Sequence, residues 1–215
     1  MSDRYAAHRK IARDLGVDAV ALVPGPNFAR LFNQNFHTSE RPLAVLIPLE
    51  GAPAALVPNL ELASFDLIGF EGEVFDWRDQ QGYRDAFAAL ARHMPLKSLA
   101  VEGQVMRVFV HHALMAAYPG LRIIDAERQI AGLRLHKSPA DIAALEAAIA
   151  ISEKALAEVL GEIRVGMTEA EVESRLIRAL FTHGAEEQAF GAIVAAPTDE
   201  ESLMQNRGKS RRNPI

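Results

Sequence analysis

Residues 133–196 read LRLHKSPADIAALEAAIAISEKALAEVLGEIRVGMTEAEVESRLIRALFTHGAEEQAFGAIVAA, and this stretch decides the fold of the second half of the chain. Ser138 followed by Pro139 predicts the start of a helix. A serine side chain can cap free backbone N–H groups, and proline at the first helical position gives up only a donor that would be unpaired anyway. Thr168, with Glu171 three residues later, has the pattern of a capping box and predicts a second helix.

Both predicted helices end at glycines and carry apolar side chains at helical spacing. Gly166 ends the first helix and Gly184 ends the second. The apolar faces comprise Ile142, Leu145, Ile149, Leu156, Val159 and Ile163 in the first helix, and Val172, Leu176 and Leu180 in the second. Residues 189–196 (AFGAIVAA) then predict a buried strand, which gives the order helix–helix–strand.

The first half of the chain alternates helix-like and strand-like segments. Gly16 and the Pro-Gly-Pro-Asn run at 24–27 mark breaks between elements. We expect helices at 3–15, 59–65, 82–94 and 105–118, and strands at 18–23, 42–48, 54–57, 98–102 and 121–125. The short helix at 59–65 should be capped by Asn59, and residues 125–137 should connect two domains. This alternation predicts an α/β layer structure with helices covering a mixed sheet.

Composition narrows the class of protein. The chain has 215 residues, 49% hydrophobic and 24% charged, as in a globular protein with a sizeable core. A net charge of −5 argues against a general nucleic-acid or membrane-surface binder. The sequence has no cysteine, so disulfides and thiolate metal sites are excluded. The charged N-terminus and the lack of a long apolar run predict neither a signal peptide nor a membrane span, so we expect a cytoplasmic protein.

Two stretches resemble the creatinase, prolidase and aminopeptidase P family of metal-dependent peptidases. Residues 27–64, NFARLFNQNFHTSERPLAVLIPLEGAPAALVPNLELAS, resemble the hairpin of the family's N-terminal domain. The stronger resemblance lies in residues 133–196, where Leu-Arg-x-x-Lys-Ser-Pro, Gly-Met-Thr-Glu and Gly-Ala-Glu…Phe follow the opening of the family's "pita-bread" catalytic domain. The resemblance covers residues 1–196.

Membership would imply a ribonuclease-H-like N-terminal α/β domain, here 1–131, and the start of a pita-bread α+β domain, here 132–196. Residues 197–215 are expected to be an unstructured tail outside the family, and the chain a truncated member. The family hydrolyses Xaa-Pro bonds with two divalent metals, often manganese, cobalt or zinc. These are held by two Asp, one His and two Glu on strands that follow the first helix–helix–strand unit.

None of those family ligands falls on a residue of this chain. We therefore assign no catalytic, substrate-binding or metal-ligating residue and expect no cofactor in this chain. Asp199, Glu200 and Glu201 indicate a solvated acidic turn. Arg207, Lys209, Arg211 and Arg212 indicate a solvated tail, the alternative being a nucleic-acid contact.

The other candidate side chains have simpler structural explanations. His111 and His112 are adjacent in a predicted helix and point about 100° apart, which does not suit one metal. His93 and His183 lie near helix ends, where a cation is favourable, and His136 lies in the connector. Trp77 indicates an aromatic packed on the sheet, with ligand stacking as the alternative. His37 stays open, either as a loop residue or as a contact to a second subunit's active site.

Two functions from different classes follow from the sequence. The first is an inactive truncated form of an Xaa-Pro dipeptidase or aminopeptidase, which would take a peptide substrate only when completed by the missing half. The second is a non-catalytic interaction module built on the N-terminal domain. The unpartnered helix faces predict self-association or a homo-oligomer, with no nucleic-acid or membrane partner.

Overall fold

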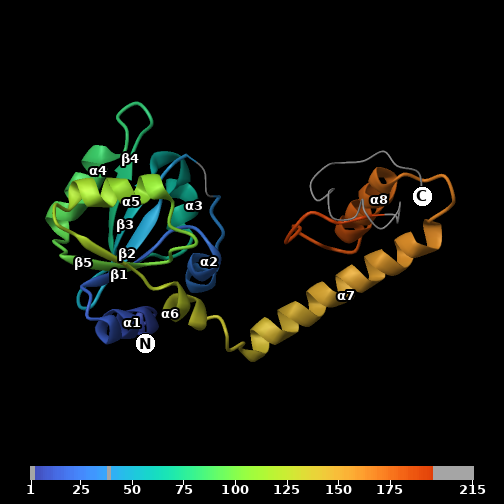
Figure 1. Cartoon of the computed structure of the whole chain (residues 1–215), viewed down its shortest axis with the longest axis horizontal. Helices are drawn as coiled ribbons and strands as arrows, with labels where there is room; N and C mark the ends of the chain where they lie inside the picture. The colour runs from blue at the N-terminus through green and yellow to red at the C-terminus, as the bar shows by residue number, and fades with distance from the viewer. Residues whose placement is uncertain (1–2, 38–39, 196–215) are drawn as a thin grey trace, which may run out of the picture. The chain divides into compact units, whose positions relative to one another are not determined.

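A computed structural model describes residues 3–37 and 40–195 of the chain. The chain divides into two compact units, Met1–His136 and Lys137–Ile215, and each is described by itself (Figure 1). None of the helices in the described part of the chain is long and apolar enough to span a membrane.

The first unit is an α/β structure built on one six-stranded mixed sheet. Its elements are α1 (Ala6–Leu15), β1 (Ala19–Leu22), α2 (Pro26–Phe32), β2 (Ala44–Pro48), β3 (Ala54–Pro58), the 3₁₀ helix η1 (Asn59–Glu61), α3 (Leu62–Asp66), β4 (Glu73–Trp77), α4 (Arg84–His93), β5 (Ser98–Val101), α5 (Val108–Ala117), β6 (Arg122–Asp125) and α6 (Glu127–Gly132). The strand order is β4-β3-β2-β1-β5-β6. Strand β2 runs antiparallel to β1 and β3, whereas the pairs β1–β5, β5–β6 and β3–β4 are parallel.

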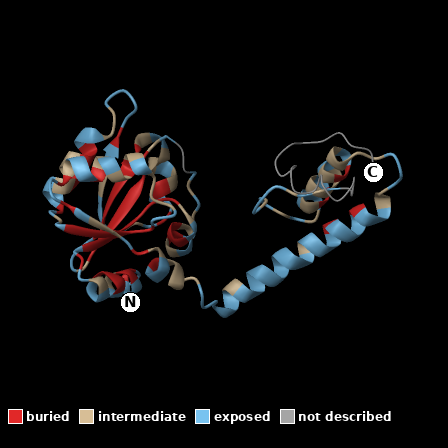
Figure 2. Cartoon of the chain, viewed as in Figure 1, coloured by how far each residue is buried: buried red, intermediate tan, exposed pale blue. Residues whose placement is uncertain are grey.

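Helices cover both faces of this sheet, as the alternating strand pattern requires (Figure 1). In β1, Val20 and Leu22 face one core, which α1, α2, α3 and α6 complete. Ala19 and Ala21 face the other core, which α4 and α5 complete. Figure 2 shows the central strands buried throughout. The predicted fold class, a mixed-sheet α/β domain, is therefore confirmed.

Local sequence chemistry explains several element boundaries. Helix α1 stops at Gly16, whose φ of 62° is the left-handed conformation that glycine adopts most easily. The apolar run at 42–48 forms β2, and a turn containing Gly51 returns the chain into β3 as the predicted hairpin.

The second unit begins with the two predicted helices, α7 (Pro139–Glu162) and α8 (Glu169–Thr182). Both have a complete capping box: Ser138 with Asp141 caps α7, and Thr168 with Glu171 caps α8. The helices pack through a small core of Ala155, Val159, Val172 and Ala179, with Ile163, Met167, Leu176, Leu180 and Val194 around it.

The predicted buried strand at Ala189–Ala196 is wrong. Residues 189–195 form no strand, and Phe190 and Ile193 are 77% and 86% exposed; Ala196 lies outside the described residues. A strand needs a neighbouring strand to pair its backbone N–H and C=O groups, and the described residues of this unit supply none.

Some details of the first unit also differ from the sequence expectation. Asn59 does not cap α3, because it lies inside η1, and its side-chain amide donates a long hydrogen bond (3.4 Å) to Asp76 instead. The expected turn at 24–27 leads directly into α2, with Pro26 in its first turn. The connector contains a further short helix, α6.

Candidate functional site

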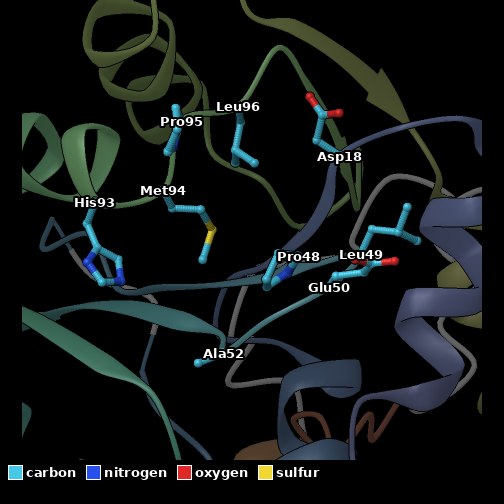
Figure 3. Close-up of a pocket in the computed structure, with 9 residues that line it drawn as sticks. All are labelled: Asp18, Pro48, Leu49, Glu50, Ala52, His93, Met94, Pro95 and Leu96. Carbon is cyan, nitrogen blue, oxygen red and sulfur yellow. The ribbon is translucent and has the colours of Figure 1, made fainter.

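A pocket lies in the first unit beside the start of β1 and the end of β2. It has a volume of about 460 Å³ and is lined by Asp18, Pro48, Leu49, Glu50, Ala52, His93, Met94, Pro95 and Leu96 (Figure 3). The lining comes from three segments: the residue before β1, the end of β2 with the turn that follows it, and the last residue of α4 with the connection to β5. Antiparallel pairing of Ala19 with Pro48 brings the first two segments together. The walls are of mixed polarity, and the ionisable side chains among the lining residues are two carboxylates and one imidazole.

Asp18 is held by the backbone of the neighbouring loop. Its carboxylate accepts hydrogen bonds from the N–H groups of Lys97 (2.7 Å) and Ser98 (2.9 Å). The bond from Lys97 contributes most to a pKa of Asp18 below its ordinary value, so this group is an ionised acceptor. The His93 ring lies 5.4 Å from the Phe75 ring. Among the nine described lining residues none carries a hydroxyl or thiol, so the pocket offers contacts but no side-chain nucleophile of that kind.

A second polar cluster is buried where β5 ends, and we call it the Asn27 network: Asn27, Glu102 and Arg134. The Asn27 amide donates to Oε1 of Glu102 at 2.6 Å, and its carbonyl oxygen accepts from Nε of Arg134 at 2.9 Å. Asn27 lies in the first turn of α2, Glu102 directly follows β5, and Arg134 follows α6. The network therefore ties the connector onto the first unit.

Burial dominates the electrostatics of Glu102, which is 1% exposed. Burial raises the pKa of Glu102, and the nearby charge of Glu127 adds to the effect. The hydrogen bond from Asn27 and the charge of Arg134 act in the opposite direction. Oε2 of Glu102 has no hydrogen-bond partner among the described residues. This carboxylate depends on Asn27 for its direct hydrogen bond, and we assign it a structural role.

Apart from the adjacent pair His111 and His112, the candidate histidines lie in different segments of the chain. His111 and His112 lie on α5 as a half-buried and an exposed neighbour, with ring centroids 5.8 Å apart. His93 closes the last turn of α4, and His136 is exposed in the connector. Nε2 of His183, at the end of α8, lies 2.7 Å from Oε2 of Glu158 on α7. These positions agree with structural explanations for His93 and His183.

The two remaining candidates lie in the first unit. Trp77 ends β4 and is 6% exposed, and its indole N–H donates to the backbone carbonyl of Pro42 at 3.2 Å. Trp77 therefore packs on the sheet, as the sequence favoured. His37 is exposed in the described chain just before the gap at 38–39.

We tested whether the described residues fit the two divalent metals that the family resemblance implies. Within residues 3–37 and 40–195, no group of three or more His, Asp or Glu side chains is arranged to hold a metal ion. A hydrolytic metal needs three or more such ligands converging on one point. The described residues do not fit the group. Asp199, Glu200 and Glu201 lie outside them.

Comparison with known proteins identifies the family. Residues 4–136 match the Creatinase/Prolidase N-terminal domain. The chain belongs to this family. Residues 143–213 match a second description, Metallopeptidase family M24, so the N-terminal domain is followed by the start of an M24 domain. This second match extends through residues 197–213, which the sequence expectation placed outside the family and which lie outside the described residues.

The relatives that the chain matches carry peptidase names. A "Probable dipeptidase PepE" of Mycobacterium tuberculosis is 27% identical over 199 residues, which are 90% of this chain and 52% of the relative. The crystal structure of dipeptidase PepE from Mycobacterium ulcerans is similar with a TM-score of 0.72 and 27% identity, covering 87% of this chain and 50% of that one. A recombinant prolidase from Thermococcus sibiricus, at 23% identity and a TM-score of 0.78, shares the fold over 89% of this chain and 53% of that one. The chain spans about half the length of the curated relatives it matches.

Sequence reasoning missed both polar features of the first unit. Asn27 and Glu102 are 75 positions apart, and no local pattern links them. A glutamate directly after an apolar strand was the available signal for Glu102, because such a position is buried when the strand is central. Arg134 lies in the Leu-Arg-x-x-Lys-Ser-Pro motif, but the motif does not reveal its partner.

Proposed function

We propose that this chain supplies the N-terminal domain and the opening helices of the catalytic domain of a metal-dependent peptidase that cleaves Xaa-Pro bonds, and that residues 1–215 alone do not perform the hydrolysis. The order of the two family matches supports the first part, as do the dipeptidase and prolidase names of the relatives. A peptide substrate would then bind only when further polypeptide completes the catalytic domain.

One observation carries the proposal of inactivity: the described residues contain no converging set of metal ligands. In this family's chemistry the metal lowers the pKa of a bound water and polarises the carbonyl of the scissile bond. Among its described residues the second unit contributes α7, α8 and an irregular segment that forms no strand, whereas ligands held at fixed distances require packed elements around them.

The test is a peptidase assay on purified chain 1–215 with a dipeptide ending in proline and added Mn²⁺ or Co²⁺. A matched control is the chain ending at residue 136, which lacks the whole second unit. We expect the same background rate from both chains. Metal-dependent turnover that copurifies with 1–215 and is absent from the control would contradict the proposal.

A second candidate function is a non-catalytic interaction module built on the N-terminal domain. The first unit has its own hydrophobic core on each face of the sheet, which supports independent folding of that domain. If a chain without peptidase activity still assembles with copies of itself, that result would favour this second function.

We also propose a cytoplasmic location, which the absence of cysteine from the sequence supports.

A further inference from the structure

Helix α1 contains a buried histidine whose ring makes no hydrogen bond to the described residues. His8 is 4% exposed, and neither of its ring nitrogens reaches solvent or has a partner among those residues. Buried polar groups in proteins are nearly always hydrogen-bonded, so this imidazole is exceptional. Burying a neutral imidazole in this way is costly, and burying the protonated ring without a partner costs much more.

His8 lies in the middle of the apolar face of α1. Tyr5 precedes it by three residues and Ala12 follows it by four, so the three side chains share one side of the helix. Tyr5, Ile11 and Ala12 belong to the core that α1 shares with α2, α3 and α6. The elements packed against α1 include β1, β2, β5 and the neighbouring α6 (Figure 1). All of these elements belong to the first unit, so the first unit itself buries His8.

The charged groups of the described residues give a protonated His8 no support. Strands β1, β2 and β5 carry no titratable side chain, and α6 carries Glu127 and Arg128. Three charged groups adjoin the strands, namely Asp18, Lys97 and Glu102, and four lie on α1 itself, namely Arg9, Lys10, Arg13 and Asp14. Burial alone lowers the pKa of His8 from 6.5 to about 4, and no charge contributes to the shift. Protonation therefore favours any state in which the ring reaches water.

Helix α1 can open without unfolding of the sheet. Strands β1, β2 and β5 are buried throughout, and each is hydrogen-bonded to a strand on both sides. The ends of α1 are tied to other segments by exposed hydrogen bonds: Arg9 donates to the carbonyl oxygen of Gly51 at 2.7 Å, and Arg122 donates to that of Gly16 at 3.3 Å. A segment held in this way opens at a lower free energy than the central strands.

We propose that His8 makes α1 an acid-sensitive segment, which opens away from the sheet when the buried imidazole takes up a proton, while β1, β2 and β5 stay paired. Val20 and Leu22 of β1 then lose part of their cover. This device goes beyond the peptidase role, and it is measured as local opening and not as turnover.

The experiment is amide hydrogen exchange of the full chain at pH 7 and pH 5, corrected for the effect of pH on intrinsic exchange. If opening restores the ordinary pKa of His8, the opening constant of α1 should rise about 20-fold between these two values. Carboxylates with ordinary pKa values stay ionised at pH 5. Helix α4 is the internal control, because it packs on the other core and its His93 is exposed. An α1 that opens equally at both pH values, or an equal rise in α1, α4 and β2, would overturn the proposal.

A pair of variants assigns the effect to His8. His8→Leu removes the titrating group from the core, so the opening constant of α1 should be the same at pH 7 and pH 5. His112→Leu removes an exposed histidine of α5 and should keep the rise of about 20-fold. A rise that persists in His8→Leu would contradict the assignment.

A further measurement needs no variant. In the wild type, the pKa of the His8 ring followed by nuclear magnetic resonance should lie well below 6.5. A ring that titrates at pH 6.5 while the amide signals of α1 stay unchanged would show that α1 accommodates the charge without opening, and would overturn the proposal.

Discussion

Replacing Asn27 with leucine tests whether the Asn27 network stabilises the first unit and the connector. Leucine has the same number and branching of side-chain heavy atoms as asparagine, although its methyl groups are bulkier, and it can neither donate to Glu102 nor accept from Arg134. Because Asn27 is 3% exposed and Glu102 is 1% exposed, water does not readily replace the lost partner. In this variant, neither oxygen of the Glu102 carboxylate would accept a hydrogen bond from a described residue.

The expected loss follows from these contacts. A hydrogen bond to a charged group contributes about 1.5–3 kcal/mol, and removing the partner of a buried charge costs up to about 3–5 kcal/mol. The bond to Arg134 adds little, because Arg134 is only half-buried. We therefore expect Asn27→Leu to lower the free energy of unfolding by about 2–4 kcal/mol. For a domain of this size that lowers the melting temperature by on the order of 10 °C.

The loss should depend on pH. Burial already raises the pKa of Glu102, and the hydrogen bond from Asn27 opposes this, so Asn27→Leu raises the pKa further. When the folded-state pKa lies above the unfolded value, protonation favours folding. That stability is complete below the ordinary pKa and is lost as pH rises through the folded-state pKa. The cost of Asn27→Leu should therefore be largest near neutral pH and smaller toward pH 4.5, the ordinary value for Glu102.

The assay is urea unfolding followed by tryptophan fluorescence. Trp77 is the one tryptophan in the sequence and is buried in the first unit, so its signal reports that unit. Glu102→Gln completes a double-mutant cycle. In the Glu102→Gln background, Asn27→Leu should lower the free energy of unfolding by less than half as much as it does in the wild type. A cost below about 0.5 kcal/mol, or the same cost in both backgrounds, would show that Asn27 does not stabilise the fold through Glu102, because the effects of independent sites add.

Three further outcomes are expected. Burial lowers the pKa of His8 from 6.5 to about 4, so the unfolded chain takes up a proton at higher pH than the folded chain, and the free energy of unfolding falls as pH drops between these values. His8→Leu should reduce this pH dependence, measured by unfolding followed through Trp77 fluorescence. Thr168→Ala should destabilise α8 by about 1 kcal/mol, seen as faster amide hydrogen exchange in its first turn, whereas Ser174→Ala in mid-helix should not. Residues 1–136 expressed alone should unfold in one cooperative thermal transition, and a broad non-cooperative melt would argue against an independent domain.

The sequence predicted correctly those helix ends that are determined by side chains within a few residues of the end. The capping pairs of Ser138 with Asp141 and Thr168 with Glu171 form as the sequence indicated, and Gly16 ends α1 in the expected conformation. These features need only side chain and backbone of the same turn, so no distant partner can override them.

Elements that depend on distant partners were not predictable in the same way. Residues 189–195 have the apolar composition of a strand but no strand beside them in the described chain. Strand β4 has a single buried residue, Trp77, and shows no regular alternation of buried and exposed side chains; its parallel pairing with β3 therefore has no local signal in the sequence. The exposure of Ile142, Leu145 and Ile149 was expected from the helix face alone, because that face needs a partner whatever the partner is.

The buried polar groups show the same limit. Asn27 looked like part of a turn, and Glu102 looked like the end of a strand. Their contact depends on how β5 and α2 meet in the fold, which brings two residues 75 positions apart to 2.6 Å. The sequence alone does not indicate that Glu102 is the carboxylate that is buried, nor that the Asn27 amide donates its hydrogen bond.

Titration calorimetry of the full chain with Mn²⁺ determines whether residues 1–215 form the two-metal centre of the family by themselves. We expect no tight uptake of Mn²⁺, because the described carboxylates and imidazoles form no group that could hold a metal. The heat should match that of the chain ending at residue 136. Binding of two equivalents of Mn²⁺ per chain at micromolar affinity, lost in the shorter chain, would contradict this expectation.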